Sequence, residues 1–138
     1  MAKVLVPIDG SKNSIRALAY IALRARRGEN IQAHVLFVQP TALPSLYVTR
    51  SMIKDWQKAE RDRVFSNPKI KTLTKRLKAH ICLETGDVAE AILKAARKYR
   101  CAEIVMGSRG LGRLKRLILG SVATKIIHAS PVPVTIVK

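Results

Sequence analysis

Short apolar runs alternate with segments of helical period along the whole chain. The runs predict strands at Lys3–Asp9, Ile31–Val38, Ala79–Glu84, Ala102–Met106 and Val132–Val137. The helical spacing predicts helices at Ser11–Arg27, from Ser51 to about Phe65, beyond Asn67-Pro68 to Lys78, at Asp87–Tyr99, and from about Gly120. Strands that alternate with helices indicate an α/β protein with a parallel sheet covered by helices on both faces.

The apolar residues within two of these helices predict which side faces the sheet. In the first helix they are Ile15, Leu18, Ala19 and Ala22, and in the fourth they are Val88, Ile92, Ala96 and Tyr99. Pro7 lies inside the first apolar run, and proline cannot donate to a sheet ladder. We therefore expect strand pairing to end at Pro7.

The ends of two strands carry residues suited to a ligand. In doubly wound sheets, ligands bind outside the carboxyl ends of the strands, where the strand order reverses. Asp9 ends the first predicted strand and Gly107 follows the fourth. If these strands are neighbours, both residues face the same crevice.

The segment after the fourth strand has the glycine spacing G-x2-G-x9-G-S, formed by Gly107, Gly110, Gly120 and Ser121. Glycine lets the backbone approach a ligand closely. The free amides at a helix start bind anions. Simple turns could also explain the glycines, but strand, glycine loop and helix start together predict a phosphate cradle in a nucleotide-binding protein.

Composition fits a single domain, residues 1–138. The chain has 138 residues and is 48% apolar, enough for a packed core. It has no apolar run long enough to cross a membrane and no signal-peptide pattern at its start, so we expect a cytoplasmic protein without a membrane partner. Cys82 and Cys101 lie outside any C-x-x-C pair and are expected to be free buried thiols.

The formal net charge of +17 permits binding to nucleic acid, an anionic membrane or another polyanion. Aromatic residues make up only 4%, which argues against a base-stacking surface and predicts at most weak, non-specific nucleic-acid binding. A basic run lies between the glycines, where it could be solvated or help to hold a polyphosphate. Its members are Arg109, Arg113, Lys115 and Arg116.

The sequence contains no recognisable catalytic motif. His34, His80 and His128 lie on separate elements without metal-ligand spacing. A Walker A motif is absent, and with it the lysine that such loops place on the phosphates. We therefore expect a protein that is not an enzyme, with ATP hydrolysis slow at most.

The chain resembles the universal stress protein family over essentially its whole length. The resemblance rests on Val6-Pro-Ile-Asp-Gly-Ser11, Leu36-Phe-Val-Gln-Pro40, Gly86-Asp-Val-Ala-Glu-Ala-Ile92, the glycine motif and Pro131-Val-Pro-Val-Thr-Ile-Val137. It implies a doubly wound, Rossmann-like sheet of five parallel strands in the order 3-2-1-4-5. Glu103 and Arg113 depart from the family pattern, which often has Asp and Gly there.

The same resemblance implies ATP as the ligand, with or without Mg²⁺. Asp9 would hold ribose hydroxyls or Mg²⁺, or would only cap the first helix. Val38 would read the adenine edge, or would only be sheet core. The implied nucleotide-binding residues are Pro7, Ile8, Asp9, Val38, Met106, Gly107, Arg109, Gly110, Gly120, Ser121, Val122 and Ala123.

The resemblance also implies a role and an assembly. Members of the family are commonly homodimers, and we expect pairing through the C-terminal strand. The protein would act as a stress-response sensor or adaptor toward an unknown protein partner. The alternatives are a nucleotide-free protein scaffold and a charge-driven nucleic-acid or polyanion binder.

Overall fold

A five-stranded parallel sheet in the order β3-β2-β1-β4-β5 organises the computed structural model, which describes residues 1–108 and 119–138. The strands are β1 (Ala2–Pro7), β2 (Ile31–Gln39), β3 (His80–Thr85), β4 (Glu103–Gly107) and β5 (Val134–Val137). The helices are α1 (Lys12–Arg26), α2 (Arg50–Phe65), α3 (Pro68–Leu77), α4 (Val88–Lys98) and α5 (Ser121–Ala129). The doubly wound fold and its strand order are confirmed, with element ends within one or two residues of the predicted ones.

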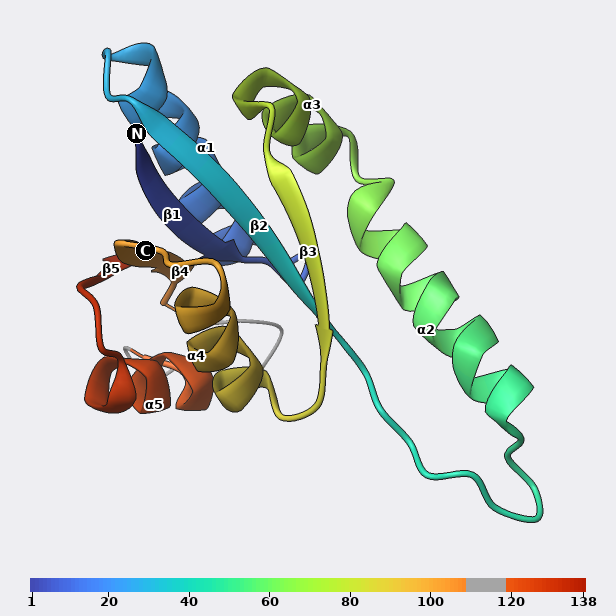
Figure 1. Ribbon diagram of the computed structural model, residues 1–138. Coiled ribbons are helices and arrows are strands. Elements are labelled where there is room, and N and C mark those ends of the chain that lie inside the picture. Colours follow the sequence, from blue (N-terminus) through green and yellow to red (C-terminus); the bar gives the residue numbers. More distant parts are fainter. Residues whose placement is uncertain (109–118) are drawn as a thin grey trace.

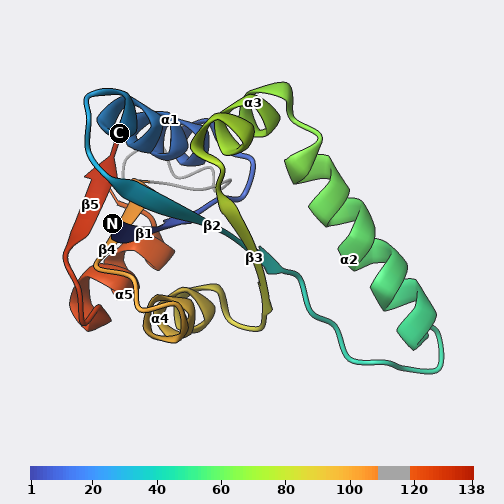
Figure 2. The ribbon, with the colours of Figure 1, turned by 45° about the horizontal axis from the view of Figure 1, so that its top comes forward.

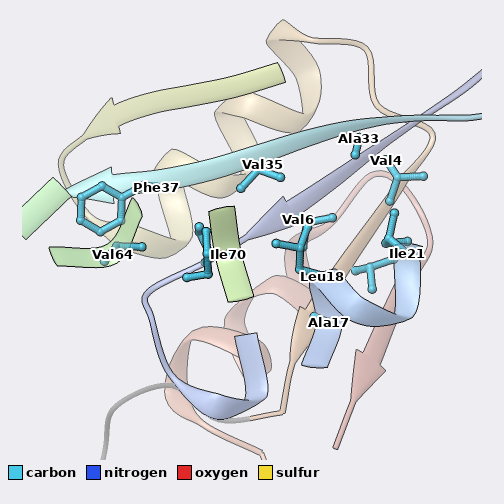
Figure 3. Close-up of a cluster of buried hydrophobic side chains, with 12 residues drawn as sticks. Val4, Val6, Ala17, Leu18, Ile21, Ala33, Val35, Phe37, Val64 and Ile70 are labelled. Carbon is cyan, nitrogen blue, oxygen red and sulfur yellow. The ribbon is translucent and has the colours of Figure 1, made fainter. Parts of the chain in front are cut away.

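Helices cover both faces of the sheet. α1 and α3 lie on one face and α4 and α5 on the other, while α2 extends away from the sheet (Figures 1 and 2). The first core layer contains Val4, Val6, Ile8, Ala17, Leu18, Ile21, Ala33, Val35, Phe37, Val64, Ile70 and Val105 (Figure 3). The second contains Leu5, Leu36, Cys82, Ala89, Ile92, Ala95, Ala96, Cys101, Ile104, Met106, Ala123 and Ile126.

Two details of the predicted helix faces are wrong. Ala19 is exposed, because the buried stripe of α1 runs through Ser14 and Leu18. The pattern missed Ser14 because its side chain is polar; the hydroxyl is satisfied by donating to the carbonyl oxygen of Ser11 at 2.9 Å. Val88 is 43% exposed because it is the first residue of α4 and lies at a cavity rather than in the core.

Strand pairing ends at Pro7 as predicted. Pro7 pairs with Leu36 in the register of β1 and β2, and β1 stops there. The amide of Ile8 still donates to the carbonyl oxygen of Leu36 at 2.8 Å, so the chain leaves the sheet in a fixed direction. In the described part of the chain, no helix has both the length and the apolar character needed to cross a membrane.

Candidate functional site

A cavity of about 700 Å³ opens at the carboxyl ends of β1, β2 and β4. This volume lies within the roughly 300–1,000 Å³ of small-molecule sites. β1 lies between β2 and β4, so the cavity occupies the point where the strand order reverses. The expected shared crevice of Asp9 and Gly107 is therefore confirmed, since both residues line it.

The cavity collects the predicted nucleotide-binding residues that the structure describes. They are Pro7, Ile8, Asp9, Val38, Met106, Gly107, Gly120, Ser121, Val122 and Ala123. Arg109 and Gly110 lie outside the described residues, as do Arg113, Lys115 and Arg116. Sequence reasoning missed the other lining residues: Ser11, Ser14, Leu36, Phe37, Val88, Ile92, Ser108, Leu119, Thr124 and Lys125.

The Asp9 carboxylate is positioned by a tight turn. Its Oδ1 accepts the amide of Ser11 at 2.8 Å, and the turn passes through Gly10, whose φ of +85° favours glycine. Ser11 caps α1 by accepting the amide of Ser14 at 3.2 Å. The helix-cap interpretation of Asp9 is therefore wrong. Within the described residues, Oδ2 of Asp9 has no hydrogen-bond partner, which leaves it available to a ligand.

The start of α5 differs from the starts of the preceding helices. Its N-cap is Gly120, which has no side chain to accept an amide, whereas Ser11, Thr49, Asn67 and Asp87 cap α1 to α4. The first helical bond runs from the amide of Thr124 to the carbonyl oxygen of Gly120 at 3.0 Å.

The three preceding residues, Ser121, Val122 and Ala123, all line the cavity. Their amides have no acceptor within residues 1–108 and 119–138. The arrangement provides donors for an anion.

Gly107 is required by packing. A Cβ there would lie 2.7 Å from the carbonyl carbon of Asn13 and 2.9 Å from its oxygen, in the first turn of α1. The next residue, Ser108, is buried, and its carbonyl oxygen accepts the amide of Gly120 at 2.8 Å. Gly107 therefore lets β4 approach α1 closely, and Ser108 then ties the start of α5 to the end of β4.

The remaining cavity walls are largely apolar. β2 contributes Phe37 and Val38, and α4 contributes Val88 and Ile92. Val38 is half-buried, so part of its surface is open to the cavity. These apolar residues, together with amides that have no acceptor within residues 1–108 and 119–138, suit a ligand with a flat ring at one end and negative charge at the other.

Histidine and cysteine side chains gather between β2, β3 and the end of α4, and none of them lines the cavity. His34 stacks on His80 with 5.0 Å between ring centroids and lies 5.3 Å from the Tyr99 ring. Burial lowers the pKa of His34, and the charges of His80 and Lys3 lower it further.

Burial also raises the pKa of the Cys82 thiol and brings that of Cys101 to about 11, so both are free, protonated thiols. Among the described residues, no group of three His, Cys, Asp or Glu side chains could hold a metal ion.

A five-stranded parallel sheet with helices on both faces and a cavity at its switch point defines a doubly wound α/β protein. The universal stress protein family model matches residues 1–138, and the chain belongs to this family. It is 32% identical over 146 residues to universal stress protein YxiE of Bacillus subtilis (strain 168), a match that covers 99% of this chain and 98% of that protein.

Solved structures agree on the fold. The universal stress protein UspA from Lactobacillus plantarum matches with a TM-score of 0.81 at 19% identity, over 99% of this chain and 97% of that chain. A universal stress protein family protein from Arabidopsis thaliana, solved with AMP bound, matches with a TM-score of 0.71 at 20% identity, over 100% of this chain and 92% of that chain.

Proposed function

We propose that the chain binds an adenine nucleotide, with ATP as the preferred form, in the cavity at the switch point. The observation that carries this proposal is the start of α5, which has no side-chain cap and whose first residues line the same cavity as Asp9. The phosphates would accept from Ser121, Val122 and Ala123, and the ribose hydroxyls would donate to Oδ2 of Asp9. AMP in the Arabidopsis family member supports an adenine nucleotide as the ligand.

The adenine ring fits the apolar end of the cavity. Val38 and Phe37 on β2 and Ile92 on α4 lie on its walls, so a flat ring there would be shielded from water. The backbone of Val38 at the end of β2 would then read the ring edge. Mg²⁺ prefers oxygen ligands and keeps its waters, so Asp9 could hold it through water beside the phosphates.

We infer a binding role rather than catalysis. Among the described lining residues, Asp9 is the one carboxylate and no histidine is present. One Asp9 oxygen is already occupied by the amide of Ser11. Hydrolysis of ATP, if any, would be slow, and the bound nucleotide would set the state of a sensor or adaptor.

A homodimer through β5 fits this role. β5 lies at an edge of the sheet, and its four residues are all half-buried. Such an edge is a template for pairing with a second strand. The carbonyl oxygens of Pro133 and Val137 accept the amides of Ile104 and Ser108. Because the backbone groups of successive strand residues point to opposite sides, the amide of Val134 faces away from β4. We propose antiparallel pairing of two β5 strands.

Two measurements test this proposal. The first is mass spectrometry of ligand released from gently purified protein, followed by calorimetric titration with ATP, ADP and AMP. Near-stoichiometric adenine nucleotide is expected; a chain that releases none and binds none would favour the nucleotide-free scaffold. The second is light scattering of the parent and of Val134→Pro, which removes the outward amide. The parent is expected to be a dimer and the variant a monomer, and a parent that stays monomeric would exclude the β5 interface.

A further inference from the structure

The segment between β2 and α3 forms an arm, here residues 40–63, that extends from the body of the protein. Figures 1 and 2 both show the chain leaving β2, running to the far end of α2 and returning along it. Val64 is the one buried residue of α2 and lies near its return to the sheet. The outer part of the arm is therefore free of the core.

Internal hydrogen bonds give the arm a defined shape. Gln57 Nε2 donates to the carbonyl oxygen of Pro40 at 2.8 Å and ties the outgoing chain to α2. At the turn, the amide of Ser45 donates to the carbonyl oxygen of Val48 at 2.8 Å. Thr49 caps α2 by accepting the amide of Met52 at 3.1 Å. The residues at the far end are thus held together as one surface.

That surface is apolar. The side chains are exposed at Leu43 (89%), Leu46 (95%), Tyr47 (87%), Met52 (52%) and Trp56 (45%). Met52 and Trp56 lie one turn apart on α2 and therefore share a face. Clustered exposed apolar residues mark an interaction site more often than isolated ones do.

The charged residues around this surface indicate the kind of partner that it would bind. Arg50, Lys54 and Lys58 are exposed on the same arm. The arm also carries Asp55, Glu60 and Asp62, but its basic residues outnumber them, and the chain carries +17 overall. A second copy of the chain would bring the same positive charge. Nucleic acid offers negative charge but no apolar phase for leucine and methionine. An anionic bilayer offers both, with headgroups for the basic residues and acyl chains for the apolar ones.

We propose that the arm docks on an anionic lipid bilayer, with Leu43, Leu46 and Tyr47 inserted at its surface. A protruding tip can enter a flat surface without a clash from the body of the protein. Trp56 and Tyr47 are of the type that lies at headgroup depth, with an apolar ring and a polar edge. The expectation of no membrane partner was based on the lack of a spanning segment, which surface insertion does not require.

Trp56 is the one tryptophan in the sequence, so its fluorescence reports on the arm alone. The full chain is titrated with vesicles of phosphatidylglycerol and phosphatidylcholine, and with vesicles of phosphatidylcholine alone. The emission is expected to shift to shorter wavelength with the anionic vesicles only. Leu46→Ser combined with Tyr47→Ser should weaken partitioning by at least about tenfold, since two apolar side chains no longer enter the bilayer.

Ile81→Ser is the matched control, because Ile81 is 48% exposed but lies on β3, away from the arm. It should partition like the parent, and circular dichroism should confirm that all variants are folded. The proposal is overturned if the parent does not bind anionic vesicles, or if the arm variant binds as well as the parent. It is also overturned if the emission shifts with protein concentration in the absence of lipid, which would identify a second copy as the partner.

Discussion

Replacing Gly120 with aspartate should stabilise the free protein and weaken nucleotide binding. The backbone of Gly120 has φ −74° and ψ 168°, close to the φ −67° and ψ 157° of Ser11, which caps α1 with its side chain. An aspartate at this position can therefore adopt the same conformation without strain and accept an amide of the first turn. Asp87 already does this in α4, where it accepts the amide of Glu90 at 3.1 Å.

The two effects have opposite signs and different sizes. Relative to glycine, the new cap contributes a few tenths of a kcal/mol, and its charge at the helix start adds about 0.3–1 kcal/mol. The melting temperature of the free protein should rise by roughly 2–5 °C. The phosphate bond to the capped amide is lost, which costs about 1.5–3 kcal/mol and weakens ATP binding by at least about tenfold. Repulsion between the introduced carboxylate and the phosphates would add to this loss.

Calorimetric titration with ATP and a thermal melt without ligand measure both effects on one sample. Asn67→Gly is the control, because Asn67 caps α3 and does not line the cavity. It should lower stability slightly and leave ATP affinity unchanged. A folded Gly120→Asp protein that binds ATP as tightly as the parent would refute the assignment of the phosphates to α5, and a lower melting temperature would refute the cap argument.

Three further outcomes are expected. Gly107→Ala should lower the free energy of unfolding by about 1–3 kcal/mol, since its Cβ would lie 2.7 Å from a backbone atom of Asn13. Urea denaturation measures this, and an unchanged midpoint would contradict the packing. The pKa of His34 is lowered from 6.5 in the folded state, so the unfolded chain takes up a proton first and stability falls as the pH drops below 6.5. His34→Gln should reduce this pH dependence in urea midpoints measured at about pH 7.5 and 5.5, and an identical drop in both proteins would contradict it. DNA binding should be weak, independent of sequence and lost as the salt concentration rises. Anisotropy titrations measure this, and a sequence preference at high salt would contradict a purely electrostatic interaction.

The sequence was sufficient to predict the fold because its central strands are buried. β1, β2 and β4 appear as nearly continuous apolar runs, and the turns between the elements carry glycine or proline. The position of the cavity followed from the parallel order, since Asp9 and Gly107 come directly after strands. Element ends were less certain, because caps such as Ser11 depend on hydrogen bonds that the apolar pattern does not contain.

The site residues that sequence reasoning missed were hidden for different reasons. Ile92 belongs to the core pattern of α4 and also reaches the cavity, so its periodicity gives no sign of a second role. Ser14 is polar on a buried helix face, which was the available signal. The role of Gly107 in helix packing could not be predicted at all, because it depends on Asn13, which is 94 residues away in the chain (107 − 13).

The first amides of α5 have no acceptor among residues 1–108 and 119–138. At α1 to α4 a side chain accepts one of the first amides, and each such cap typically stabilises a helix by about 1 kcal/mol relative to alanine. At Gly120 that contribution is absent, and the residues of the first turn line a cavity. A bound anion would supply the missing acceptors, and a ligand that binds only the folded state stabilises it in proportion to the logarithm of its concentration above Kd. Nucleotide binding and the stability of α5 are therefore expected to be linked, because the same amides take part in both.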